Sequence, residues 1–575
     1  MRFSAWSAVL LVASLTIRVE ASPIDETYWV HSFAKELEAS RVSSGGSIAY
    51  CEVCRATVGL IRAHGESTPS ETLLDVLIFL CKNLGIESSQ VCHGIIPKFK
   101  DVLFTTINKT PLSASDICSL AFNNQCGSTS TETQWSVNTT GVPKPPVRQV
   151  PLPKPGSPVL RIAQLADTHV DERYVPGSLV DCNDPLCCRA NSTPKKNPLG
   201  EPAKAGFWGT YSRCDVPQRT LRESVRYLAE VVKPDVVYWT GDIMPHDVWE
   251  NTREDNLRQF NDTLSLLKTH LPAVKVIPAM GNHEGVPVNS FPIPQIKGDL
   301  SVEWLYNSLA DLWSYYIPEE NLKTFRYGGY FKYDLNPKLR ILSLNMNYCN
   351  NFNWWILING TDPTEQLDWF TKQLQECEDK GILVHLIAHI PPGSDNCLAV
   401  WSRNFNEIVN RYESTIAGHF YGHTHNDEFE VFFDKDNATR PFATAFIAPS
   451  ITTFETGDPA FRVYHIDGIH DNSTYQVIDY ETHYMNMELA NQNPNDTYIP
   501  EWDITMSAKE VYGLPSLQPQ AYADYLKKLE SDDGAFKDFF KVYMKRLAHA
   551  TYDDASKASI LCNLRSSESN ASCKV

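Results

Sequence analysis

Short apolar runs, each ending in polar residues, constrain the fold of this chain more than any other feature of its sequence. They have the composition of buried strands, and helical stretches separate several of them. The runs are 159–166, 236–240, 274–279, 341–344, 383–388 and 415–417, and the helical stretches are 219–232, 257–270 and 366–379. This alternation predicts a layered α/β architecture with sheets between helices. Ligands of such folds collect where strands end.

A different pattern precedes these runs. Six cysteines lie within 76 residues, dense enough to tie together a small module: Cys51, Cys54, Cys81, Cys92, Cys118 and Cys126. Apolar residues repeat at three- and four-residue steps along 51–61, 73–84 and 91–103, which predicts amphipathic helices. We therefore expect an N-terminal all-α domain over 47–128. A zinc site at Cys51 and Cys54 is the alternative, but no second pair stands at zinc-finger spacing.

A proline-rich segment marks the clearest boundary in the chain. Residues 141–158 contain seven prolines, which predicts a semi-rigid linker over 129–158. A catalytic domain over 159–500 would follow, with the residues from 446 to about 501 completing its second sheet. Apolar residues at helical spacing between 525 and 547 predict a C-terminal helical subdomain over 501–575.

The first residues and the sequons indicate the compartment. Arg2, an apolar stretch and a small-residue cleavage pattern predict a signal peptide over 1–21. The stretch is shorter than the ~20 apolar residues of a spanning helix, and we expect no transmembrane span elsewhere. Fifteen cysteines and nine N-glycosylation sequons predict an oxidising route and a secreted or lysosomal protein. The sequons begin at Asn108, Asn138, Asn191, Asn261, Asn359, Asn437, Asn472, Asn495 and Asn570. A net charge of −18 argues against nucleic acid as a partner.

Acidic, amide and imidazole side chains follow five of the predicted strands. They are Asp167 and His169 in LADTH, Asp242 in WTGD, Asn282 and His283 in AMGNHE, His389 in LIAH, and His423 and His425 in GHTH. Taken singly, each has an ordinary explanation as a turn or core residue. Taken together and in this order, they resemble the calcineurin-like metallophosphoesterase superfamily, which is defined by DxH, GD, GNH[DE], H and GHxH blocks.

The resemblance implies a pair of divalent cations bridged by Asp242. Asp167, His169 and His425 would complete one site, and Asn282, His389 and His423 the other. Two cations share the negative charge of a phosphate ester and activate a water. Carboxylate and imidazole ligands without a thiolate favour two zinc ions, ahead of manganese or iron. Purple acid phosphatases add a tyrosine three residues after the bridging aspartate; Pro245 stands there, which disfavours ferric iron.

Two further histidines flank these ligands. A leaving alkoxide needs a proton, and His283 directly follows the ligand Asn282, so we assign it the general-acid role. His246, four residues after Asp242, would bind the phosphate or assist the acid. The alternative for both is a structural histidine behind the metal ligands. Asn289, close to His283 in sequence, is a candidate for contacting the substrate head group.

The grouped cysteines resemble the saposin family, whose nested pairing would join Cys51 to Cys126, Cys54 to Cys118, and Cys81 to Cys92. Elsewhere we expect the pairs Cys182–Cys187, Cys188–Cys214, Cys349–Cys397 and Cys562–Cys573, leaving Cys377 unpaired. The saposin-like module, the linker and the runs CNDPLCC, WTGDIMPHDVW, GNHEGVPVNSFP, AHIPPG and FYGHTHNDEFE together resemble the acid sphingomyelinase family over essentially the whole mature chain.

That resemblance implies hydrolysis of sphingomyelin to ceramide and phosphocholine by a hydroxide bridging the two metals. The apolar faces of the helices predicted over 73–84 and 91–103 would dock on sphingomyelin-containing membranes. The alternative, which does not exclude the first, is that these faces pack inside the protein. We expect a monomer. A phosphodiesterase acting on nucleotides or other phospholipids is the alternative enzyme, and a lipid-binding protein with an inert large domain is the non-enzymatic alternative.

Overall fold

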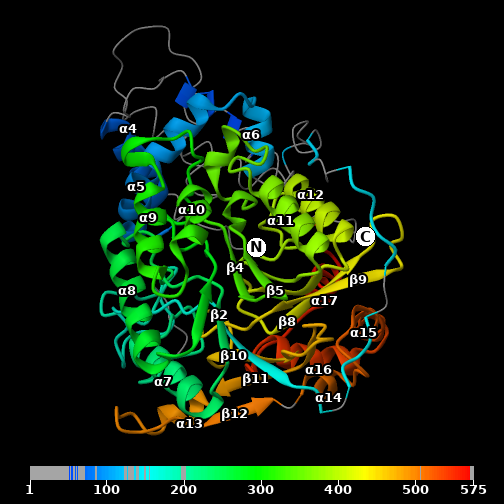
Figure 1. The fold of residues 1–575 in the computed structure, drawn as a ribbon. Helices are drawn as coiled ribbons and strands as arrows, with labels where there is room; N and C mark the ends of the chain where they lie inside the picture. The colour runs from blue at the N-terminus through cyan, green and yellow to red at the C-terminus, as the bar shows by residue number, and fades with distance from the viewer. Residues whose placement is uncertain are drawn as a thin grey trace.

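Two six-stranded sheets form the centre of the computed structural model, with helices on their outer sides (Figure 1). The predicted α/β layers are confirmed. The structure describes residues 51, 54–55, 58–59, 61–62, 71–83, 87–121, 126, 135–137, 141–147, 150–154, 156–195, 203–505 and 507–569. The predicted signal peptide lies outside the described residues.

The first sheet has the strand order β12-β11-β10-β1-β2-β3. Its strands β1, β2 and β3 are parallel, so their carboxyl ends meet at one edge. The strands are β1 (Val159–Leu165), β2 (Val236–Trp239), β3 (Lys275–Pro278), β10 (Ala460–Asp467), β11 (Val477–Met485) and β12 (Trp502–Thr505). The helices between the parallel strands are α7 (Gln218–Tyr227), which continues as a π-helical turn over Leu228–Val232, and α8 (Arg253–His270).

The second sheet has the order β4-β5-β6-β7-β9-β8, and β5, β6, β7 and β9 are parallel. Its strands are β4 (Phe331–Asn336), β5 (Leu339–Ser343), β6 (Leu383–Ile387), β7 (Ile416–Tyr421), β8 (Glu428–Phe433) and β9 (Pro441–Ile447). The associated helices are α9 (Glu303–Trp313), α10 (Glu319–Gly328), α11 (Gln366–Lys380) and α12 (Ala399–Arg411), with short 3-10 turns at Gly298–Leu300, Met346–Tyr348 and Trp354–Leu357.

The prediction that residues after 446 complete the second sheet is wrong beyond β9. Strand β10 returns to the first sheet and pairs antiparallel with β1, from Val159 opposite Asp467 to Gln164 opposite Arg462. β11 and β12 extend that sheet further, so it continues past residue 500. An apolar run reports that a strand is buried, but it does not report which sheet edge the strand joins.

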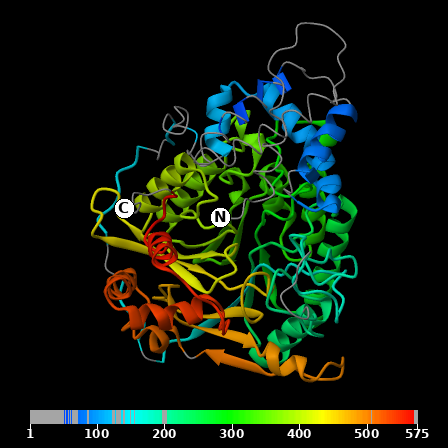
Figure 2. The ribbon, with the colours of Figure 1, turned by 180° about the vertical axis from the view of Figure 1, so that it is seen from behind.

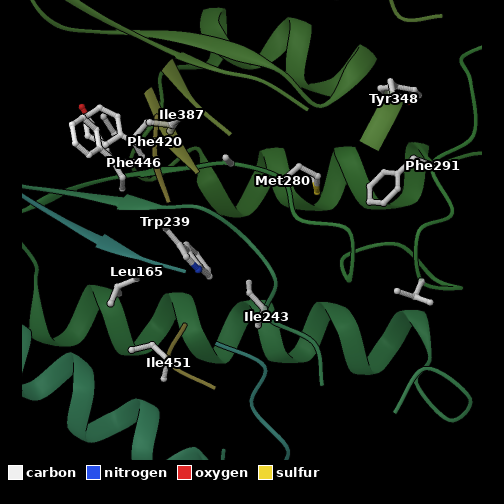
Figure 3. Packing of buried hydrophobic residues seen from close by; sticks show 14 of the residues in the cluster. Leu165, Trp239, Ile243, Met280, Phe291, Tyr348, Ile387, Phe420, Phe446 and Ile451 are labelled. Carbon is white, nitrogen blue, oxygen red and sulfur yellow. The ribbon is translucent and has the colours of Figure 1, made fainter. Parts of the chain in front are cut away.

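A single buried apolar cluster joins the two sheets. Leu165 and Trp239 from the first sheet belong to the same buried cluster as Ile387 and Phe420 from the second (Figure 3). Buried polar contacts also join the sheets: Gln164 Nε2 donates to the Tyr421 carbonyl at 2.8 Å. These contacts fix the two sets of strand ends relative to each other.

The N-terminal helices α4 (Glu71–Asn83), α5 (Ser89–Lys109) and α6 (Ala114–Ala121) lie at one end of the molecule (Figures 1 and 2). The three nested disulfides predicted for this segment are present. The apolar face of α5, which we considered for lipid docking, is buried, with Val91 and Phe99 each 1% exposed. The face of α5 therefore packs inside the protein, while membrane docking by the module stays a prediction.

Helix α5 also contacts the large α/β part. The Thr110 hydroxyl donates to the Leu357 carbonyl, and Lys98 donates to the Asn251 carbonyl. Gly94 lies so close to Trp249 that a Cβ atom at Gly94 would lie 2.4 Å from the Trp249 carbonyl oxygen. The helical module is thus packed on the segment that follows His246.

The proline-rich segment lies along the α/β part rather than spanning free space. Arg411 Nε donates to the Val142 carbonyl at 3.0 Å, and Lys144 is 2.8 Å from Glu413. Gln518 donates to the Val150 carbonyl at 3.0 Å. The described part of the linker is therefore tied down by hydrogen bonds and an ion pair.

The last helices are α13 (Met487–Asn491), α14 (Ala508–Tyr512), α15 (Pro519–Ser531), α16 (Asp533–Tyr543) and α17 (Asp554–Asn563). Of these, α15 packs beside β8 and β9, and α14 packs beside β11. The ring of Tyr522 on α15 lies 4.5 Å from that of Phe429 on β8. None of the helices within the described ranges combines the length and apolar character needed to cross a bilayer.

The disulfides of the α/β part agree with the prediction. Cys182–Cys187, Cys188–Cys214 and Cys349–Cys397 are all present. Cys377 is buried on α11 and has no disulfide partner within the described ranges. Cys573 lies outside those ranges, so its pairing with Cys562 stays a prediction.

Candidate metal centre

The predicted metal ligands converge above the carboxyl ends of β1, β2, β3, β6 and β7. Parallel strands place their carboxyl ends together, which is why residues far apart in sequence meet here. Asp167, His169 and His389 have no measurable solvent exposure, and Asp242 is 2% exposed. Within the described ranges, three overlapping sets of side chains bring possible ligand atoms within 4.8 Å of one another: His169, His246 and His425; His169, Asp242 and His283; and Asp242, His389 and His423.

Asp242 occupies the middle of the group. Its Oδ2 atom lies 3.5 Å from Nε2 of His169 on one side and 3.1 Å from Nε2 of His389 on the other. On the first side, His425 Nε2 is 3.7 Å from Asp167 Oδ1. On the second side, His389 Nε2 is 3.1 Å from Asn282 Oδ1. This is the arrangement expected of a carboxylate shared between two cation positions.

The imidazoles are oriented as metal ligands usually are. The Nδ1–H of His169 donates to the Met244 carbonyl at 2.5 Å, and that of His389 to the Thr240 carbonyl at 2.7 Å. His425 Nδ1 lies 3.4 Å from the Phe454 carbonyl. Because Nδ1 carries the proton, each Nε2 presents a lone pair to the site.

The fit to a cation is sharpest between His169 and His425. Their Nε2 atoms face each other at 3.3 Å. Two lone pairs at this distance repel each other unless a cation or a proton lies between them. The donor set, imidazole nitrogens with carboxylate and amide oxygens, therefore fits divalent ions of the zinc or manganese type.

The ligand residues have an unusual backbone. Asp167, His169, Asp242, His423 and His425 all have φ between 35° and 77°. A left-handed conformation costs a residue other than glycine about 1–3 kcal/mol, and such residues cluster at functional sites. The loops after β1, β2 and β7 therefore turn sharply at the ligand residues themselves.

Two glycines explain the spacing within the sequence blocks. A Cβ atom at Gly281, before Asn282, would lie 2.2 Å from Asp242 Oδ1. One at Gly422, before His423, would lie 2.7 Å from Asp167 Oδ2. Only a residue without a side chain lets these loops approach the carboxylates.

The two buried carboxylates dominate the electrostatics. Burial opposes a charge on His169, but Asp242 and its neighbours raise the pKa of that imidazole to about 9. His389 is affected in the same way, and its pKa is raised to about 10. Burial raises the pKa of Asp167 to about 6. The site thus has a strongly negative potential, which favours cations.

His283 lies beside the ligands. Its backbone N–H donates to Asp242 Oδ1 at 2.8 Å, and its ring centroid is 4.7 Å from that of His169. Within the described ranges its Nδ1 atom has no hydrogen-bond partner. Burial lowers the pKa of His283 well below its usual range, against the effect of Asp242. An anionic phosphate next to the ring would favour its protonated form.

His246 has a partner that the sequence did not reveal. Its Nδ1–H donates to Asp215 Oδ1 at 2.9 Å, and its ring stacks on Phe454 with centroids 3.9 Å apart. The Thr452 hydroxyl also donates to Asp215, at 2.8 Å. Asp215 follows no strand and no sequence block, so nothing in the sequence pointed to it.

Two other acidic or amide residues near the ligands have clear contacts. Glu284, the last residue of the GNHE block, accepts the Ile243 N–H at 2.9 Å and so supports the loop of Asp242. Asn289 is buried, and its Oδ1 accepts from Asn350 Nδ2 at 2.8 Å. A contact between Asn289 and a head group stays a prediction; the hydrogen bond from Asn350 uses Oδ1 and leaves the Nδ2 donors of Asn289 for such a contact.

The chain resembles characterised phosphodiesterases. The calcineurin-like phosphoesterase family model matches residues 160–427. The sphingomyelin phosphodiesterase of Bos taurus is 44% identical over 470 residues, which cover 82% of this chain and 74% of the relative. The sphingomyelin phosphodiesterase of Homo sapiens is 43% identical over 496 residues, covering 86% and 77%. Sphingomyelin phosphodiesterase 2 of Caenorhabditis elegans is 33% identical over 518 residues, covering 86% and 82%.

Proposed function

The chain belongs to the sphingomyelin phosphodiesterase family of metal-dependent phosphodiester hydrolases, and we propose that it hydrolyses sphingomyelin to ceramide and phosphocholine with two zinc ions. The position of Asp242 between two groups of ligand atoms supports this proposal most directly. Asp167, His169 and His425 hold one ion with Asp242, and Asn282, His389 and His423 hold the other. Bound there, the ions would activate a water for attack on phosphorus and share the charge of the phosphate.

The residues of the chain itself position and protonate the substrate. Cleavage on the ceramide side frees a primary alkoxide, which needs a proton. His283 is the proposed general acid, because it is adjacent to the ligands and its Nδ1 is unengaged within the described ranges. His246, whose ring lies 4.8 Å from that of His283, would bind the phosphate or assist this transfer, with Asp215 holding its orientation.

The surrounding features support a role outside the cytosol. Six disulfides are formed among the described residues, and the asparagines of the sequons at Asn191, Asn261 and Asn437 are exposed. We propose that the enzyme is secreted or lysosomal, and that its saposin-like domain brings it to sphingomyelin-containing membranes. The nested disulfide pairing supports that domain assignment.

An Asp242→Ala variant tests the mechanism. Zinc content would be counted by mass spectrometry, and phosphocholine release would be measured on sphingomyelin vesicles at an acidic and a neutral pH. We expect the variant to lose bound zinc and all turnover while the wild type holds two ions. Unchanged turnover in Asp242→Ala would refute the proposal, and so would an active, metal-free wild type.

A substrate panel separates the alternatives. The same wild-type preparation would be offered sphingomyelin vesicles, phosphatidylcholine vesicles and a nucleotide phosphodiester. Preference for sphingomyelin is the expected outcome. Preference for the nucleotide would refute the proposed substrate, sphingomyelin, but would not contradict the proposed metal site.

A further inference from the structure

His423 is held differently from the other three proposed histidine ligands. His169, His389 and His425 direct Nδ1 to backbone carbonyls, so Nε2 faces the site. In His423 it is Nε2 that is engaged, 2.9 Å from Oδ1 of Asn396. An amide oxygen only accepts hydrogen bonds, so Nε2 of His423 carries the proton and Nδ1 keeps the lone pair. His423 therefore offers the opposite ring nitrogen to the cation position that it shares with Asp242 and His389.

Asn396 is itself held firmly in place. The next residue, Cys397, forms the disulfide with Cys349. The Asn396 backbone N–H donates to the Ser394 hydroxyl at 3.2 Å, and its carbonyl accepts from the Asn351 N–H at 2.9 Å. A disulfide and two hydrogen bonds thus fix an amide that meets a histidine from a different strand-end loop.

The difference matters because a backbone carbonyl is present whatever the residue, whereas this contact depends on one side chain. We propose that Asn396 is a positioning residue that holds His423 in the Nε2–H tautomer and so sets the affinity of the cation position formed with Asn282 and His389. The inference rests on the ligand set of the proposed function. Hydrogen-bond partners behind metal ligands contribute about 10- to 100-fold to metal affinity.

The alternative is that Asn396 only maintains its loop. Two variants separate these roles. Asn396→Leu keeps the size of the side chain but removes the acceptor, while Asn396→Asp keeps an acceptor at the same place. Asn351→Leu is the matched control, because its amide donates to the Asp395 carbonyl in the same loop and does not contact His423.

The test measures zinc affinity directly, with a chromogenic chelator in competition with the folded protein, together with the number of ions retained. Asn396→Leu should bind one of its two zinc ions about 10- to 100-fold more weakly. Asn396→Asp should stay near the wild type, and Asn351→Leu should match it. Equal loss in the Leu and Asp variants, or in the Asn351 control, would overturn the inference, as would unchanged affinity in Asn396→Leu.

A His423→Ala variant distinguishes failure of this inference from failure of the ligand set. If His423→Ala loses one ion and Asn396→Leu does not, the ligand set stands and the role of Asn396 is refuted. If His423→Ala retains both ions at full affinity, the ligand set itself is wrong and the inference falls with it.

Discussion

His246 and Asp215 form a buried pair in which the carboxylate accepts both the ring Nδ1–H and the backbone N–H of the histidine, at 2.9 and 2.7 Å. Burial works against a charged Asp215, yet His246 keeps the pKa of that carboxyl at about 2. Asp215 is therefore an anion throughout the physiological range. It fixes the proton on Nδ1 and turns Nε2 of His246 toward the metal centre.

An Asp215→Asn substitution should show whether Asp215 acts by orienting His246. We expect turnover of sphingomyelin to fall about 10- to 100-fold, because His246 loses the anion that fixes its tautomer. The loss should be smaller on a nitrophenyl phosphodiester, whose leaving group needs little proton assistance. Turnover on both substrates and zinc content would be measured. An equal loss on both substrates would mean that Asp215 does not act through proton delivery.

The buried carboxyl of Glu428 on β8 should make the free energy of unfolding depend on pH. Burial raises the pKa of its carboxyl to about 7, helped by Asp427 and opposed by Thr424 and Arg462. The folded state therefore binds more protons than the unfolded state between the ordinary pKa and about 7, so the free energy of unfolding decreases as the pH rises through this window. Each unit of pKa difference corresponds to about 1.4 kcal/mol.

A Glu428→Gln variant should flatten this dependence. Melting temperatures measured at about pH 5 and about pH 7 should differ less in the variant than in the wild type. Glu488→Gln, which changes an exposed glutamate on α13, is the matched control and should keep the wild-type difference. If the variant retained the full pH dependence of the wild type, the carboxyl of Glu428 would not titrate in this pH range.

Much of the metal centre was predictable because its ligands follow strands. A parallel strand delivers the residue after it to one edge of a sheet, so Asp167, Asp242 and His389 could be grouped from the sequence alone. Asp215 and Asn396 could not, because Asp215 directly follows no strand and Asn396 lies well beyond His389 in the loop after β6, outside every sequence block. Their positions depend on neighbouring disulfides, at Cys214 and Cys397, and on contacts across long sequence separations.

The fold, like the metal centre, could be predicted from the sequence only in part. The apolar runs located the central strands, since burial on both faces leaves a continuous run. They did not assign β10 to the first sheet, because the pairing of β1 with β10 depends on contacts between segments far apart in the sequence. Likewise, helical spacing predicted an apolar face along 91–103 but did not say what covers it, and in the structure that face is buried.

Removing the metal ions should destabilise the folded protein. Bound cations would screen the repulsion between the Nε2 atoms of His169 and His425, which lie 3.3 Å apart, and would neutralise the buried carboxylates Asp167 and Asp242. A ligand that binds only the folded state at 100 times its dissociation constant stabilises it by about 2.7 kcal/mol. Chelator-treated protein should therefore melt several degrees lower, and zinc should restore the transition. An unchanged melting temperature would contradict a structural contribution from the ions.

Two glycines in the helical module allow a matched test of how α5 is packed. Glycine in a helix costs up to about 1 kcal/mol relative to alanine, so Gly→Ala stabilises a helix where there is room. Among the described residues, none lies within 4 Å of a Cβ atom built on Gly59, and Gly59→Ala should raise the melting temperature. At Gly94 the same atom would lie 2.4 Å from the Trp249 carbonyl oxygen and 2.9 Å from its Cβ.

Gly94→Ala should therefore have the opposite sign. Backbone atoms cannot move aside as a flexible side chain can, and overpacking typically costs about 1–3 kcal/mol. Because Trp249 lies three residues after His246, displacement of this segment should also lower turnover of a soluble phosphodiester, which needs no membrane docking. Melting temperature and turnover would be measured for both variants. If Gly94→Ala were as stable and as active as Gly59→Ala, α5 could not be packed against Trp249 as closely as the structure places it.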